Sequence, residues 1–227
     1  MDTHHAAVVQ DGERADIVAM ADEIVQMLRH VRDGFGRLDP QVVDQASRLG
    51  RLVHKQEQGV LERLARQSVA ARIAGAARDE DVVFVPMHLE RIAENVERLG
   101  ASAVKVVREG TLFTDRAQRE VGGLITLAIE ILEGVRDAIR TGNLVLVRYV
   151  IEASRSCETR VNEYAHFHEK RLIEGVCQPR ASSIYLMMLD DIRGIEWHAR
   201  QVAEKLHGIL PPAGAAPAGR PGRPIDL

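Results

Sequence analysis

Two stretches of sequence decide the fold: MHLERIAENVERLG at residues 87–100 and YLMMLDDIRGIEWHA at residues 185–199. In the first stretch, apolar residues recur in steps of three and four, which is the spacing of one face of an α-helix. A shift of 100 residues places the first stretch on the second and matches Met87 with Met187, Leu89 with Leu189 and Ile92 with Ile192. The two copies predict an internal repeat.

A second match strengthens the repeat, because a shift of 104 residues places the tripeptide Val-Arg-Asp at 31–33 on the same tripeptide at 135–137. Four further apolar stripes at helical spacing flank these segments. We therefore predict an all-α chain of six long helices, arranged as two tandem, pseudosymmetric three-helix bundles. The predicted parts are a flexible N-terminus at 1–14, a first repeat at 15–108, a second repeat at 115–208, and a disordered tail rich in Pro, Gly and Ala at 209–227.

Several helix boundaries carry local signals. Asp39 precedes Pro40, which predicts an N-cap followed by proline at the first helical position. Pro86 falls either in the first turn of the third helix or at a kink within it. Ser182 and Ser183 are candidate caps of the sixth helix, and residues 75–81 are expected to form a loose connection.

Composition excludes several classes of protein. The chain has 227 residues, 45% hydrophobic residues and a net charge of -3, so no global basic field attracts nucleic acid. It contains no uncharged apolar run long enough to span a membrane and no apolar N-terminal segment typical of a signal peptide. Its two cysteines, Cys157 and Cys177, match neither a disulfide framework nor a paired-cysteine zinc site, so a reducing cytoplasm is the expected location.

Glu90 and Glu94 lie four residues apart on the third predicted helix, so their carboxylates share one face, one turn apart. Two such carboxylates repel each other unless a cation lies nearby. A metal ion that prefers oxygen ligands is one way to neutralise them. Salt bridges to neighbouring arginines are the other, and the spacing alone leaves both open.

The first stretch resembles the third-helix motif of PhoU-like phosphate-uptake regulators, and the second stretch resembles the second copy of that motif. The resemblance spans both halves of the chain and implies the two-bundle fold, with metal clusters held by acid-x-x-x-acid motifs. It also implies a cytoplasmic negative regulator, peripheral at the inner membrane, which couples a phosphate transporter component to a sensor histidine kinase.

Carried over residue by residue, the resemblance is incomplete. Glu90 and Glu94 fill both acidic positions of the first copy, whereas Gly194 replaces the second acid after Asp190. On the second helices of the two repeats, Gly50 precedes His54 and Ser154 precedes Glu158, so each pair lacks its first acid. The metal ligands implied are His54, Glu90, Glu94, Glu158 and Asp190, with iron, manganese or zinc as the ion.

No sequence motif favours an enzyme, because the chain has no glycine-rich phosphate loop and no Gly-x-Ser-x-Gly turn. Two alternatives to the regulator stay open. One is a metal-storage or oxygen-reactive helical bundle, for which Glu163 and His166 supply a single Glu-x-x-His step. The other is a helical scaffold without metal. Self-association as a homodimer is also left open.

Overall fold

The computed structural model describes residues 11–73, 83–111 and 113–210. These residues form six helices and, within the described ranges, no strand. The helices are α1 (Asp11–Arg37), α2 (Pro40–Ile73), α3 (Phe84–Arg108), α4 (Asp115–Thr141), α5 (Leu144–Ile173) and α6 (Pro179–Ile209). The predicted connection at 75–81 and the predicted tail from 211 onward lie outside the described residues.

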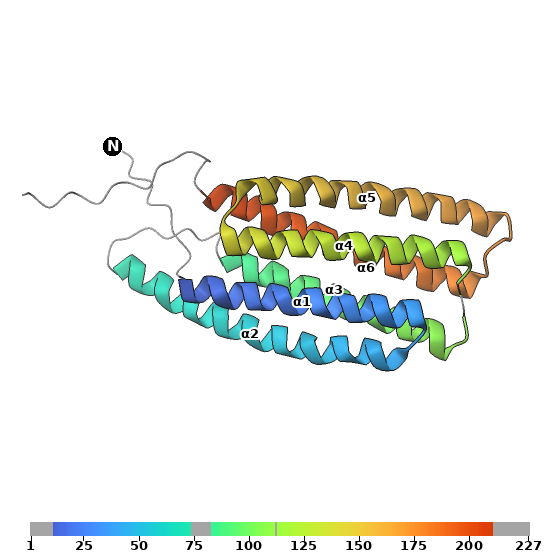
Figure 1. Cartoon of the computed structure of the whole chain (residues 1–227), viewed down its shortest axis with the longest axis horizontal. Helices are drawn as coiled ribbons and strands as arrows, with labels where there is room; N and C mark the ends of the chain where they lie inside the picture. Colours follow the sequence, from blue (N-terminus) through green and yellow to red (C-terminus); the bar gives the residue numbers. More distant parts are fainter. Residues whose placement is uncertain (1–10, 74–82, 112, 211–227) are drawn as a thin grey trace, which may run out of the picture.

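The six helices run roughly along the long axis of the molecule and pack as two sets of three (Figure 1). In each set, every helix contacts the other two: α1, α2 and α3 in the first, and α4, α5 and α6 in the second. The two sets join through equivalent helices, since α1 contacts α4 and α3 contacts α6. This pairing confirms the predicted pseudosymmetric arrangement of two three-helix bundles.

A single hydrophobic core runs through both sets. The apolar stripe of the stretch at 87–100 is buried, with Leu89, Ile92, Val96 and Leu99 all fully shielded from solvent. Within each set, two helices approach closely at a glycine: a Cβ on Gly100 of α3 would lie 3.0 Å from Val43 Cγ1 of α2, and one on Gly134 of α4 would lie 2.9 Å from Val150 Cγ2 of α5. The internal repeat therefore folds into one body, because the inner helices of each repeat are buried against the other repeat.

The observed helix ends confirm some of the local signals. The Asp39 carboxylate accepts a hydrogen bond of 2.9 Å from the backbone N–H of Gln41, as expected of an N-cap. Pro86 lies in the first turn of α3. A backbone N–H in the first turn has no acceptor within the helix, so a proline there costs no helical hydrogen bond. Thr114 and Asn143 cap α4 and α5 in the same way as Asp39.

Two boundaries differ from the prediction. The first helix begins at Asp11 rather than at Ala15, so residues 11–14 are helical. The sixth helix begins at Pro179, and the prediction that Ser182 and Ser183 cap it was wrong. Both serines lie inside the first turns of α6, and their hydroxyls donate to the carbonyl oxygens of Gln178 and Pro179, four residues back.

Candidate functional site

His54 on α2 and Glu90 on α3 meet on the surface of the first bundle. The Nδ1 atom of His54 lies 3.3 Å from Glu90 Oε1, and its Nε2 atom lies 3.0 Å from the side-chain nitrogen of Gln58. An amide nitrogen can only donate, so Nε2 accepts and Nδ1 carries the proton that is shared with Glu90. The structure therefore brings together the histidine and the first acid of the predicted metal site.

Two further carboxylates, Glu57 and Glu97, lie near this pair, and of these Glu97 was not predicted as part of the site. Burial raises the pKa of Glu57, and the negative charge of Glu90 raises it further. Burial also raises the pKa of Glu97; Arg51 lowers it, and Glu90 and Glu94 raise it again. The surface between α2 and α3 therefore concentrates negative charge.

The carboxylate of Glu97 occupies the space beside Gly50. A Cβ placed on Gly50 would collide with the carboxylate of Glu97, which lies directly over that glycine. Gly50 stands where the family motif on α2 has its first acid, and the carboxylate of Glu97 from α3 lies beside that position.

The other predicted ligands are held by arginines. Arg91 donates to Glu94 at 2.7 Å, Arg200 to Glu158 at 2.9 Å, and Arg193 to Asp190 at 2.6 Å. These ion pairs neutralise the carboxylates without a metal, which was the second way left open by the sequence.

A metal ion needs three or four protein ligands to be held firmly. Of the five predicted ligands, only His54 and Glu90 come into contact. Within the described ranges, no group of three or more His, Cys, Asp or Glu side chains is placed to hold a metal ion. The side chains as they stand do not form a complete metal centre, so metal binding stays a prediction.

Sequence reasoning missed a buried acid in the second bundle. Glu196 on α6 is 0% exposed, and neither of its carboxylate oxygens has a hydrogen-bond partner. The nearest cation is Arg200, whose Nη2 lies 3.9 Å from Oε1. Burial raises the pKa of Glu196 to about 7, so this side chain changes charge near neutral pH. In the internal repeat, at a shift of 100 residues, Glu196 corresponds to Val96, which is an apolar core residue.

Other polar atoms lie buried on the neighbouring helix α5. The hydroxyl of Ser154 is fully buried without a hydrogen-bond partner. Cys157 is also fully buried, and burial together with the charge of Glu196 raises the pKa of its thiol to about 12. The thiol is therefore protonated and unreactive at neutral pH.

A histidine pair connects the two bundles. His88 on α3 and His198 on α6 approach with their Nδ1 atoms 3.0 Å apart. Their ring centroids are 5.3 Å apart, which places the two nitrogens almost end to end, as in a hydrogen bond between imidazoles. Burial lowers the pKa of both rings, that of His198 to about 4, so the pair is neutral at neutral pH.

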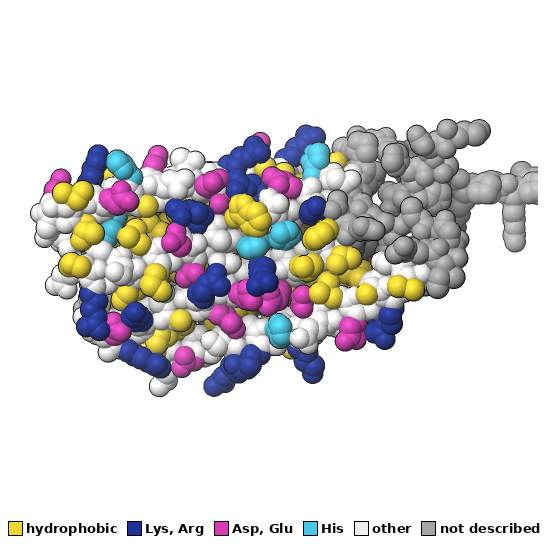
Figure 2. Space-filling view, turned by 180° about the vertical axis from the view of Figure 1, so that it is seen from behind, with side chains coloured by type: hydrophobic (Ala, Val, Ile, Leu, Met, Phe, Trp, Pro, Cys, Tyr) yellow, Lys and Arg dark blue, Asp and Glu magenta, His cyan; other side chains and the backbone are white. Residues whose placement is uncertain are grey.

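The histidine pair lies on the face formed by α3 and α6, which is turned toward the viewer in Figure 2. Apolar side chains are interspersed there with acidic and basic ones. The largest exposed apolar residues of the two helices are Phe84, Met87, Met187 and Trp197, each 42–50% exposed.

A buried ion-pair network joins the three helices of the second bundle. Glu120 on α4 accepts hydrogen bonds from Arg171 at 2.9 Å, from Tyr185 at 2.7 Å and from Arg116 at 2.8 Å. Burial alone would raise the pKa of Glu120, but the three hydrogen bonds outweigh it and hold the pKa at about 2. Glu120 therefore stays ionised throughout the physiological range.

The solved structures that resemble this chain include PhoU and PhoU-like proteins that cover 87–89% of it. The crystal structure of PhoU from Pseudomonas aeruginosa matches with a TM-score of 0.73 and 16% identity, over 88% of this chain and 95% of that one. The phosphate transport system regulatory protein PhoU from Streptococcus pneumoniae matches with a TM-score of 0.66 and 8% identity, over 87% and 93%. A PhoU-like phosphate regulatory protein from Shewanella oneidensis MR-1 matches with a TM-score of 0.60 and 12% identity, over 89% and 98%.

These similarities show that the chain has the PhoU fold, as the sequence motifs predicted. No protein-family model and no curated protein matches the chain. Among the described helices, none combines the length and the apolar character needed to cross a bilayer.

Proposed function

We propose that this protein is a PhoU-like regulator of phosphate transport that acts by binding other proteins and not by catalysis. The observation that carries the proposal is the six-helix PhoU fold, matched over 87–89% of this chain by proteins that their descriptions call PhoU or phosphate regulatory proteins. Fold similarity alone transfers function weakly. The sequence motifs at 87–100 and 185–199 add support, because they resemble the same family independently of the structure.

In this proposal the protein works in the cytoplasm, at the inner face of the membrane. Its partners are a phosphate transporter component and a sensor histidine kinase, and it lowers phosphate uptake or signalling when phosphate is abundant. A second copy of the chain is a further candidate partner. The exposed apolar residues of α3 and α6 provide surface that any such protein contact would cover.

A metal ion on the first bundle is the finer form of the proposal. Its support is the contact between His54 and Glu90 and the carboxylates of Glu57 and Glu97 beside it. Zinc, iron or manganese bound there would neutralise the surface between α2 and α3. The adaptor function does not depend on this ion, because the ion pairs of Glu94, Glu158 and Asp190 already neutralise the other motif positions.

The alternative of an oxygen-reactive bundle receives no support from the Glu-x-x-His step on α5. Glu163 and His166 are both exposed, whereas the ligands of a di-iron bundle project into its core.

The proposal is tested in a bacterial strain that lacks its own PhoU and therefore expresses phosphate-starvation genes in phosphate-rich medium. This chain, PhoU from Pseudomonas aeruginosa and an empty vector are expressed in parallel, and a starvation reporter and phosphate uptake are measured. We expect this chain to lower both, as the positive control does. The transporter and kinase that accompany this chain in its own organism are expressed with it. If the folded protein accumulates and both readouts still match those of the empty vector, the proposal fails.

A further inference from the structure

A shallow hollow of about 300 Å³ opens on the surface between α3 and α6. Ala101, Ser102 and Lys105 line it from α3, and Met187 and Asp190 line it from α6. Residues three or four positions apart lie on one face of a helix, so each helix contributes a continuous wall. The proposed adaptor function assigns no ligand to this hollow.

The hollow contains a hydroxyl group without a partner. Ser102 is 4% exposed, and its hydroxyl makes no hydrogen bond within the described part of the chain. Unlike the fully buried hydroxyl of Ser154, it is not sealed from solvent. The Ser102 hydroxyl can therefore donate a hydrogen bond to a group that enters the hollow.

The charges around the hollow leave one cation in excess. Arg98 donates to Asp191 at 3.0 Å, and Arg193 donates to Asp190 at 2.6 Å, so both acids have a cationic partner. The ammonium group of Lys105 has no ion-pair partner among the residues that the structure describes. A ligand with one carboxylate would complement this arrangement, because an ammonium group can only donate.

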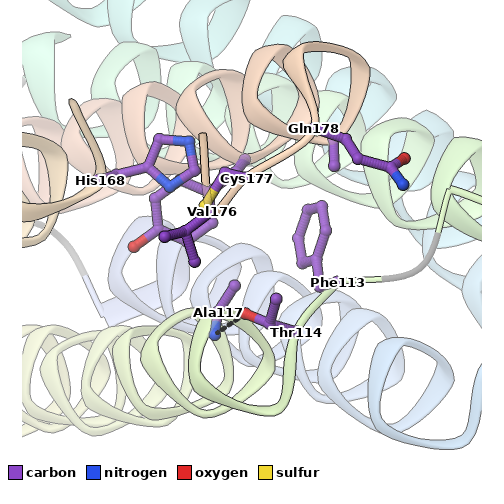
Figure 3. A pocket seen from close by; sticks show the side chains of 9 residues that line it. Phe113, Thr114, Ala117, His168, Val176, Cys177 and Gln178 are labelled. Carbon is purple, nitrogen blue, oxygen red and sulfur yellow. Dashed lines mark hydrogen bonds between the residues drawn. The ribbon is translucent and has the colours of Figure 1, made fainter. Parts of the chain in front are cut away.

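A second cavity, of about 160 Å³, lies at the end of the second bundle, where α4 and α6 begin and α5 ends (Figure 3). His168 lies next to it, but its unpartnered Nε2 atom is sealed from solvent and cannot meet a ligand there. The open hydroxyl of Ser102 and the unpaired ammonium of Lys105 make the hollow between α3 and α6 the better binding site.

Exposed apolar side chains lie between this hollow and the end of α6. The Lys205 ammonium lies 4.9 Å from the centre of the Phe84 ring, which places the start of α3 beside the last turns of α6. Phe84 and Met87 on α3 and Trp197 on α6 are exposed along this part of the surface. A chain segment that follows these side chains from the end of α6 reaches the hollow.

The segment that follows α6 has the length to do so. Asp190 precedes Leu210 by twenty residues, which is about 30 Å along a helix. A proline-rich segment covers about 3.1 Å per residue, so about ten residues span that distance. Fifteen residues separate Leu210 from Asp226, which leaves about five for reversing the direction of the chain.

The composition of the segment also matches the surface. Residues 211–227 contain five prolines, and Asp226 is their only acid. Their only large apolar residues, Ile225 and Leu227, stand on either side of that acid. Prolines pack well on exposed aromatic rings, and a carboxylate between two apolar side chains fits a cation and a hydroxyl beside an apolar wall.

We propose that residues 225–227 of this chain bind in the hollow between α3 and α6. The carboxylate of Asp226 accepts hydrogen bonds from Lys105 and Ser102, which lie three residues apart on the same face of α3. An apolar neighbour of Asp226 packs against Met187. The prolines that precede it cover the exposed aromatic side chains of α3 and α6.

A nitroxide label on the segment tests this placement in the full chain. The label is attached to Gly222→Cys in a Cys177→Ser background, since Cys157 is fully buried. NMR of the methionine methyl groups should show broadening of Met187, which lines the hollow, and none of Met27, which lies in the core of the first bundle. The broadening should persist when the labelled chain is diluted with unlabelled chain, because the segment binds within its own molecule.

Charge exchange tests the contact itself. Lys105→Glu makes this residue repel Asp226 and should remove most of the broadening, and adding Asp226→Lys should restore it. Lys170→Glu is the matched control, because Lys170 is an exposed lysine of α5 that does not line the hollow, and it should leave the broadening unchanged.

Three outcomes would overturn the proposal. The first is a Met187 resonance that is no broader than that of Met27. The second is broadening that Lys105→Glu leaves as it is in the unsubstituted chain. The third is broadening that disappears on dilution with unlabelled chain, which would show that the segment binds a second copy instead of its own molecule.

Discussion

Replacing Glu196 should remove a pH dependence of stability that the buried carboxylate creates. Its pKa is about 7 in the folded protein and about 4.5 when exposed, because burial disfavours the charged form. The folded state therefore binds the proton more tightly than the unfolded state does. The stability contributed by the protonated acid is complete below about pH 4.5 and is lost as the pH rises to about 7.

The magnitude follows from the shift. A difference of about 2.5 pKa units, at about 1.4 kcal/mol per unit, corresponds to about 3 kcal/mol of stability lost between the two pH limits. This value is appropriate to a fully buried side chain, and Glu196 is 0% exposed. The Glu196→Gln variant keeps the shape of the side chain and has no charge to bury, so it should be more stable than the wild type by about 3 kcal/mol at pH 8 and about equally stable at pH 4.5.

Urea unfolding followed by circular dichroism at pH 4.5, 6 and 8 measures the difference. The other titrating groups are the same in both proteins, so their contributions cancel in the difference between the two free energies of unfolding. Glu152→Gln, an exposed acid on α5, serves as the control and should leave the pH profile unchanged. The reasoning is refuted if Glu196→Gln shows the same pH profile as the wild type. A variant less stable than the wild type at pH 8 would show instead that Glu196 is ionised and paired with Arg200.

Three further predictions concern other parts of the molecule. Elemental mass spectrometry of protein purified without chelator should find iron, manganese or zinc, and the Glu90→Gln/Glu94→Gln double variant should hold less; equal metal in both would remove these acids from the site. Glu120→Gln should lower the free energy of unfolding by about 3 kcal/mol, because it leaves the half-buried Arg171 without its charged partner, and a loss below 1 kcal/mol in urea unfolding would contradict this. Since the pKa of Glu120 is held at about 2, the wild type should also lose stability as the pH falls from about 4.5 toward 2, and this loss should be smaller in the variant. Asp39→Ala should cost about 1 kcal/mol through loss of the N-cap of α2, with Asp44→Ala on the exposed face of the same helix as the control; equal thermal shifts in the two variants would show that the cap contributes nothing.

The candidate site was predicted only in part. His54 and Glu90 were expected to meet, and they do, because a repeat of helical stripes defines which faces of α2 and α3 pack together. The sequence could not show that Glu94, Glu158 and Asp190 each pair with an arginine. Glu94 and Asp190 each have an arginine three residues away on the same helix. Each carboxylate can therefore either pair with that arginine or point toward another helix, and its side-chain rotamer decides which of the two it does.

The amino-acid sequence by itself determined the six helices, their order and the pairing of the two repeats. Apolar spacing and helix caps are local properties, and the matches at shifts of 100 and 104 residues relate one half of the chain to the other. The stretch at 87–100 was enough to predict which side of α3 is buried, because its apolar stripe is continuous.

Only the tertiary structure decided the surroundings of the polar residues. A single stripe marks one buried face, but α6 packs against α3, α4 and α5 together, so most of its circumference is enclosed. Glu196 lies beside the stripe and is buried for that reason, and His198 meets His88 because α3 and α6 run side by side. The cavity next to His168 likewise arises where three helix ends meet, and no periodicity within one helix reports such a meeting.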